Sequence, residues 1–270
     1  EISRRPIALD MQILVLTVNM VFATTEAADV PLDVRPVGRV AAGAIAARIL
    51  KELGITLQAY TSSIGPVSCQ SYHPEIIPEN SFYMPDMVAA EKAAKYLEKC
   101  MKEEDSAGGV VECRISGVPA GIGDPVFGKL DAAFAQALMS IGAVKAVEIG
   151  DGVKVSTMKG SENNDGFHME NGRIVKTTNH SGGILGGISD GSPIRIRASF
   201  KPTPSIGQPQ SMLTRDGHCV TEVIHGRHDP VIVTRAAIVV EAMAALTLAD
   251  HLLLNLSSKI ETVKKIYGRD

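Results

Sequence analysis

Apolar residues recur at helical spacing in four stretches of the chain and alternate with polar residues in four others. The first helical stretch ends at Gly54, and Asp86 precedes the second as a predicted N-cap. The predicted helices span 39–53, 87–105, 130–142 and 234–256, and the predicted strands span 55–65, 108–119, 143–150 and 192–200.

The order of these elements predicts a single α+β domain, because residues 108–150 form a strand, a helix and a strand in succession. In the strand 192–200, Arg195 and Arg197 fall on one face and the apolar residues on the other. The last helix is apolar on almost every side, so we expect it at the centre of the core or in a subunit contact.

Two connections are long. Residues 69–85 carry three prolines and no period, which predicts an irregular connection. Residues 151–180 are polar and rich in glycine and asparagine, which predicts a long surface loop.

The composition is that of an ordinary globular protein, with 45% hydrophobic and 21% charged residues. A net charge of −3 gives no general attraction to nucleic acid or to an anionic membrane. The stretch from Ile7 to Ala23 is too short and too polar to span a membrane. The four cysteines and seven histidines lack metal-ligand spacing, so we expect reduced thiols, a cytoplasmic protein and no metal. The chain begins with neither Met nor a signal-peptide pattern, and we therefore expect it to be part of a longer chain.

Five glycines lie between Gly182 and Gly191, immediately before the strand 192–200. A dinucleotide-binding fingerprint follows a strand and opens a helix, so this run does not predict a Rossmann fold. Two interpretations stay open. The glycines form tight turns, or they let an anion or a flat ring lie against bare backbone.

Two short segments could carry chemistry. In "FKPTPSI" two prolines stiffen the backbone that presents Lys201, Thr203 and Ser205, which suits phosphate or flavin carbonyl oxygens, or simply ends a strand. In "HGRHDP", Arg227 could hold an anion and Asp229 could accept a proton or fix the tautomer of a nearby histidine. Alternatively, Arg227 and Asp229 pair with each other in an Asp-Pro turn.

Taken together, several segments resemble the chorismate synthase family, in the family's order over about residues 39–260. They are "RVAAGAIA", "SGVPAGIGDPVFGKLDA", "ALMSIGAVKAVEIGDG", "NHSGGILGGISDGSPI", "KPTPSI" and "GRHDPVIVTRA" with the "EAMAALTLADHLL" that follows.

This resemblance implies a β-α-β sandwich, a homotetramer and a bound reduced FMN. It also implies 1,4-elimination of phosphate from the small-molecule substrate 5-enolpyruvylshikimate 3-phosphate, which gives chorismate in the last step of the shikimate pathway. The family's flavin contacts fall here on Gly142, Ala143, Gly186, Lys201, Pro202, Thr203, Pro204, Ser205 and Arg227. Asp229 matches the aspartate proposed to exchange a proton with the flavin. Some members reduce their own flavin, which brings in NADP, and no motif here decides this.

The chain also departs from the family pattern. Its first 38 residues contain none of the segments "GESHG", "RPGHAD" and "RSSARETA", which hold the family's catalytic histidines and a further flavin contact. We expect these segments to belong to the protein but to be absent from this chain. The alternative is a non-catalytic homologue that binds FMN or phosphate and serves in assembly.

Overall fold

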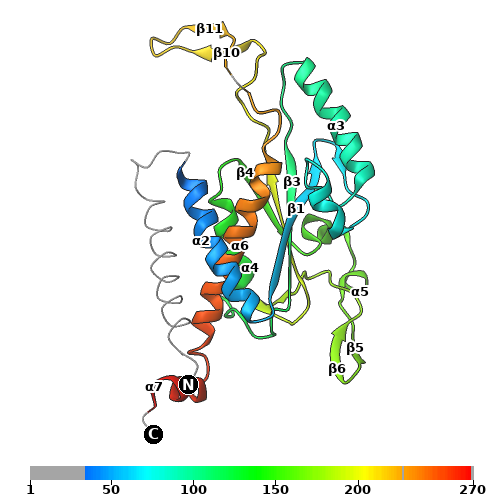
Figure 1. Cartoon of the computed structure of the whole chain (residues 1–270), viewed down its shortest axis with the longest axis vertical. Coiled ribbons are helices and arrows are strands. Elements are labelled where there is room, and N and C mark those ends of the chain that lie inside the picture. The colour runs from blue at the N-terminus through cyan, green and yellow to red at the C-terminus, as the bar shows by residue number, and fades with distance from the viewer. Residues whose placement is uncertain (1–33, 227, 269–270) are drawn as a thin grey trace.

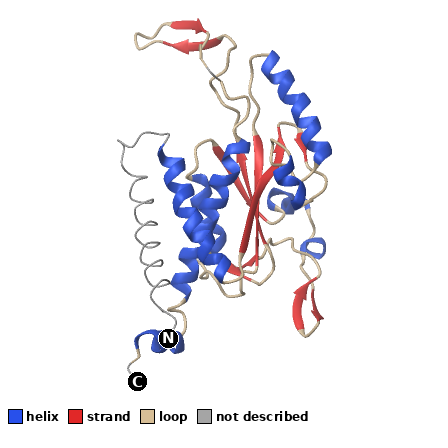
Figure 2. Cartoon of the chain, viewed as in Figure 1, coloured by secondary structure: helices blue, strands red, loops and turns tan. Residues whose placement is uncertain are grey.

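An antiparallel five-stranded sheet organises the computed structural model, which describes residues 34–226 and 228–268. Its strands, in spatial order, are β2 (Val67–Ser68), β1 (Thr56–Ile64), β3 (Gly109–Ser116), β9 (Ile194–Phe200) and β4 (Val144–Ile149). The helices α2 (Val34–Glu52), α4 (Leu130–Met139) and α6 (Val233–Asn255) lie on one side of the sheet (Figures 1 and 2). Two predictions concern residues outside those described: that the stretch Ile7–Ala23 does not span a membrane, and that Arg227 contacts the flavin.

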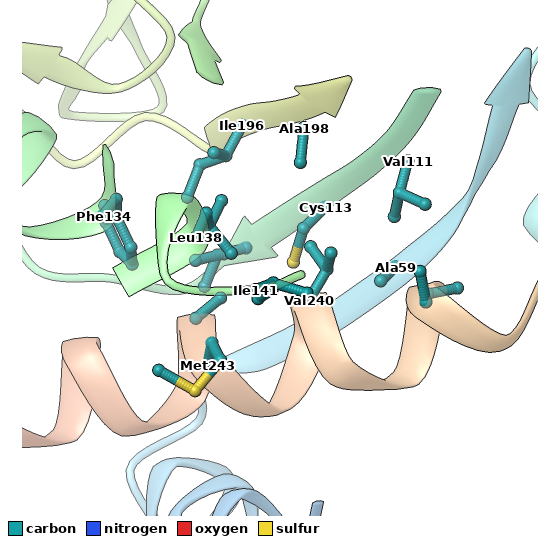
Figure 3. Packing of buried hydrophobic residues seen from close by; sticks show 14 of the residues in the cluster. Ala59, Val111, Cys113, Phe134, Leu138, Ile141, Ile196, Ala198, Val240 and Met243 are labelled. Atoms are coloured by element: carbon teal, nitrogen blue, oxygen red, sulfur yellow. The ribbon is translucent and has the colours of Figure 1, made fainter. Parts of the chain in front are cut away.

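Alternation along β9 decides which face of the sheet is buried. Ile194, Ile196 and Ala198 are fully buried, and the two arginines between them are half-buried on the other face, as the sequence predicts. Figure 3 shows the apolar side chains of β1, β3 and β9 gathered above α6. One face of the sheet therefore forms the core with the helices.

The segment β3–α4–β4 confirms the predicted strand–helix–strand unit, with one addition. Both β3 and β4 pair antiparallel with β9, which lies between them, so β3 and β4 run parallel to each other. The strand β9, which comes much later in the chain, therefore lies between the two strands of this unit and pairs with both.

The connection 69–85 contains one 3-10 turn, η1 (Pro74–Glu79), and ends at the predicted N-cap of α3 (Met87–Lys102). Asp86 accepts hydrogen bonds from the backbone N–H of Ala89 at 3.0 Å and of Gln70 at 2.9 Å. The Gln70 bond, together with those from Ala89 and Ser71, holds the pKa of Asp86 below its usual value. The predicted cap is confirmed, and the same carboxylate also fixes the preceding loop.

The prediction of a long surface loop over 151–180 is only partly correct, because the segment contains regular elements. The segment stays on the surface, but Asn171 and Gly172 both have positive φ and form the tight turn of a hairpin. Lys176 anchors this hairpin, because its ammonium lies 3.2 Å from a carboxylate oxygen of Asp165 and 2.5 Å from one of Asp190. The side chains of all three residues are largely buried. The elements within or near this segment are η2 (Gly152–Thr157), α5 (Gly160–Asn163), β5 (Phe167–Glu170) and β6 (Arg173–Lys176). The Asn-Gly pair was the sequence signal that predicts such a turn.

A second hairpin and a short helix also project from the sheet and helices (Figure 1). They are β10 (Gln210–Leu213) with β11 (Cys219–Glu222), and α7 (Ile260–Tyr267).

The predicted α+β class is confirmed. Of the three layers of a β-α-β sandwich, the described residues form one main sheet and the helical layer. The organisation of the whole chain as one domain stays a prediction.

The helices α2 and α6 pack closely against each other in the core. A Cβ built on Gly43 would lie 2.3 Å from the Cβ of Ala242 and 2.5 Å from its Cα, so only glycine allows this approach. α6 is long and apolar enough to cross a membrane, but more than half of its most apolar window is buried inside the structure. Its apolar character is therefore that of a core helix, as one of the two sequence interpretations predicts.

We expect Gly43→Ala to lower the free energy of unfolding by about 1–3 kcal/mol, because the helices must separate to admit the methyl group. Gly38→Ala is the matched control on the same helix. A Cβ there meets no atom within 4 Å, so alanine should raise stability by about 0.5–1 kcal/mol through helix propensity. Urea denaturation measures both, and equal effects of the two variants would contradict the close-contact argument.

Candidate functional site

Three strand ends meet at one edge of the sheet and bring two of the predicted segments together. Phe200, the last residue of β9, lies opposite Gly109 on one side and Val144 on the other. As a result, Lys201 donates its backbone N–H to the carbonyl of Ala143 at 3.0 Å. The Gly142–Ala143 turn and the Lys201–Ser205 segment are therefore neighbours, although 58 positions separate Ala143 from Lys201 in the sequence.

A cavity of about 670 Å³ opens at this edge between the sheet and the helices. A Cβ on Gly142 would meet no atom within 4 Å, so the backbone is accessible from the cavity side. Its lining is largely apolar with two arginines, which suits an anionic ligand that also has an apolar part. The lining residues are Pro36, Arg39, Ser140, Ile141, Gly142, Phe200, Ile232, Arg235, Ala236 and Val239.

Arg39 is one of the two cationic residues that line this cavity, and only 8% of its surface is exposed. Its Nη1 donates to the backbone carbonyl of Ser140 at 3.2 Å, which ties the first turns of α2 to the end of α4. Arg39 thus provides a positive charge whose position is fixed by the fold before any ligand arrives.

Hydrogen bonds to the connection between α3 and β3 hold the Lys201–Ser205 segment and the residues after it in place. Ser106 donates its hydroxyl to the carbonyl of Thr203 at 2.7 Å, and the N–H of Gly207 donates to the carbonyl of Glu104 at 3.0 Å. The hydroxyl of Thr203 is itself buried with no hydrogen-bond partner among the described residues. A buried hydroxyl without a partner is costly, and a ligand that bonds to it would remove that cost.

Asp229 lies just before α6 and pairs with Arg235, whose Nη2 donates to Oδ2 of the carboxylate. The predicted alternative, a pair with Arg227, lies outside the described residues. Arg235 also lines the cavity, so it connects Asp229 to the same site as Gly142 and Phe200.

A family model for chorismate synthase matches residues 35–253. This chain belongs to the chorismate synthase family. The match includes the sheet, its helices and every residue of the candidate site.

Named relatives agree with this assignment. A chorismate synthase of Lachnoclostridium phytofermentans is 59% identical over 237 residues, which are 86% of this chain and 64% of the relative. One of Porphyromonas gingivalis is 47% identical over 227 residues, which are 82% of this chain and 62% of the relative. A solved crystal structure of chorismate synthase superposes with a TM-score of 0.70 at 30% identity, covering 86% of this chain and 67% of that chain. This chain therefore spans about 64% of the length of the curated relative from L. phytofermentans.

Gly186, another residue of the predicted chorismate synthase flavin set, lies away from this end of the sheet. With Gly187 it forms the turn between β7 (Ile184–Leu185) and β8 (Ile188–Ser189), and both have positive φ, so the tight-turn interpretation is correct for this pair. Gly187 accepts from the N–H of Leu130 at the start of α4, whereas Gly142 follows the end of that helix. Ten helical residues separate the two sites by about 15 Å. The role of Gly186 toward a ligand stays a prediction.

Sequence reasoning missed the two cavity arginines, although Arg39 carries a recognisable signal. Arg39 shares a helix face with the buried residues Ala42, Ala46 and Leu50. A charged residue on an otherwise apolar face is unusual and calls for a partner or a ligand. The position of Arg235 beside Gly142 depends on tertiary contacts and has no local signal.

Other chemistry is not evident in the described residues. They contain no group of three histidine, cysteine or acidic residues that could hold a metal ion. All four cysteines are free thiols, and burial raises the pKa of Cys69 to about 12, which makes it a poor nucleophile at neutral pH.

Proposed function

We propose that this protein is a phospholyase that converts 5-enolpyruvylshikimate 3-phosphate to chorismate and phosphate with reduced FMN, in the last step of the shikimate pathway. Membership of the chorismate synthase family supports the reaction. The observation that carries the site is the cavity bordered by Arg39 and Arg235, next to Gly142 and the Lys201–Ser205 segment.

The residues of this cavity fit a flavin nucleotide. Gly142 offers backbone without a side chain in the way, and in the neighbouring Lys201–Ser205 segment the hydroxyl of Thr203 is buried with no hydrogen-bond partner among the described residues. Arg39 and Arg235 would hold anionic groups of the cofactor or of the substrate by charge-assisted hydrogen bonds. Reduced FMN, when bound, supplies the electron-rich ring that the elimination requires without net redox change.

Asp229 would handle a proton beside the flavin. Arg235 engages Oδ2 of its carboxylate, so the proton would go to Oδ1. The ion pair would also hold the carboxylate in one orientation, which a positioned acid or base needs.

A non-catalytic homologue that binds FMN or phosphate and serves in assembly is the second candidate. It is favoured by residues 1–38, which carry none of the family's catalytic histidine segments. Release of phosphate from the substrate by wild-type protein under anaerobic conditions would exclude it.

We also propose a cytoplasmic homotetramer without a nucleic-acid or membrane partner. More than half of the most apolar window of α6 is already buried within this chain, so we look for subunit contacts on other exposed apolar residues as well. Phe127 is 98% exposed at a loop tip beside Val126, and an apolar pair of this kind favours burial against a second copy.

The first prediction concerns the cofactor. FMN should bind more tightly when the phosphorylated substrate is present, because both anions would share the arginines of one cavity and close it to water. Fluorescence titration with and without substrate measures this. Protein that quenches no FMN fluorescence in either condition would contradict the proposed site.

The second prediction concerns Asp229. Asp229→Asn keeps the shape of the side chain but cannot take up a proton, so turnover should fall about 10²- to 10⁴-fold while FMN and substrate affinity stay close to wild type. Single-turnover measurement with anaerobically reduced FMN, beside the melting temperature, separates chemistry from folding. If the aspartate only supports Arg235, binding or stability should fall instead and the bound-state rate should not.

The third prediction concerns assembly. Sedimentation at micromolar concentration should give a symmetric oligomer, and Phe127→Asp should shift it toward smaller species because a charge replaces a buried aromatic contact. Phe167→Asp is the control, since Phe167 is also exposed but lies on the β5–β6 hairpin. If wild-type protein sediments only as a monomer, the proposed tetramer is excluded.

A further inference from the structure

His228 joins the two segments of the candidate site through both nitrogens of its ring. Nδ1 lies 2.9 Å from the hydroxyl oxygen of Ser205, and Nε2 lies 2.9 Å from the backbone carbonyl of Ile224. The ring is half-buried and is followed directly by Asp229.

These two contacts decide the direction of each hydrogen bond. A carbonyl oxygen only accepts, so Nε2 must carry the hydrogen that it shares with Ile224. In the neutral imidazole Nδ1 is then an acceptor, and the hydroxyl of Ser205 must donate to it. The hydroxyl hydrogen of Ser205 is therefore committed to His228, and its oxygen lone pairs are left for a donor.

The Lys201–Ser205 segment and the segment that contains His228 are also both hydrogen-bonded to residues 106–107. The carbonyl of Pro230 accepts from the N–H of Ala107 at 2.7 Å, and the neighbouring Ser106 donates to the carbonyl of Thr203 at 2.7 Å. These bonds fix the backbones of the two segments, but they leave the Ser205 hydroxyl free to rotate. The His228 ring provides the contact that orients it.

We infer that His228 is a positioning residue that acts through Ser205, by fixing its hydroxyl as a hydrogen-bond acceptor toward the ligand that the Lys201–Ser205 segment would meet. Both nitrogens of its ring are engaged by Ser205 and Ile224, so His228 would act on a ligand only through Ser205. The inference rests on the proposed function only in taking FMN as the ligand that Ser205 meets.

A double-mutant cycle between His228→Gln and Ser205→Ala tests this. Glutamine can still donate to the Ile224 carbonyl from the position of Nε2 but has no acceptor at the position of Nδ1. Each single variant should weaken FMN binding about fivefold to tenfold, as expected for one lost hydrogen bond. The double variant should bind no more weakly than either single one, because both changes remove the same contact.

Two further variants sharpen the test. His228→Asn places an amide oxygen near the position of Nδ1, so it should recover most of the FMN affinity that His228→Gln loses. His168→Gln, on the exposed strand β5, is the matched control and should bind FMN like the wild type. Melting temperatures report whether any variant fails to fold.

The inference would be overturned if the loss of FMN affinity in the double variant were the product of the two single losses. It would also be overturned if His228→Asn and His228→Gln lost FMN affinity equally. If wild-type protein binds no FMN, the proposed function fails while the contact can still be tested. The nitrogen-15 NMR resonance of His228 Nδ1 in ligand-free protein should then report an accepted hydrogen bond, and it should change in Ser205→Ala. An Nδ1 resonance that is the same in Ser205→Ala as in the wild type would overturn the inference by itself.

Discussion

The pairing of β9 with two strands at once is the interaction on which the candidate site depends. Phe200 lies opposite both Gly109 and Val144, and the chain leaves the sheet immediately afterwards. This single register aligns the start of β3, the start of β4 and the end of β9 at one edge. A slip of one residue would turn the alternating isoleucines of β9 away from α6, so the buried face of the sheet fixes the register.

Packing of the helices against that sheet then determines the cavity. α2 approaches α6 closely because Gly43 has no side chain, and this brings Arg39 to the end of α4 and beside the first turns of α6. The guanidinium groups of Arg39 and Arg235 thereby reach one cavity from two helices. The charge that would attract an anion is a consequence of helix packing in a chain whose net charge is −3.

The polar contacts around the site divide into two kinds. Bonds from the backbone and side chains of residues 104–107 fix the course of the two functional segments, whereas His228 fixes the orientation of one hydroxyl. Asp229 and His228 are adjacent in the sequence but serve different partners, Arg235 and Ser205. Chemistry and positioning can therefore be separated by substitution within one short segment.

The sequence by itself determined the elements whose signals are local: the helices α2, α3, α4 and α6, the alternation of β9, the cap at Asp86, and the motifs that resemble one family. The hairpin at Asn171–Gly172 also had a local signal, and overlooking it led to the prediction of a surface loop where the structure has a hairpin. Only the tertiary structure decided that Ala143 meets Lys201, that Arg235 and not a nearer residue pairs with Asp229 among the described residues, and that Gly186 lies at the far end of α4. These relations depend on sheet order and helix crossing, which arise from contacts between residues far apart in the chain and leave no periodic pattern in the sequence.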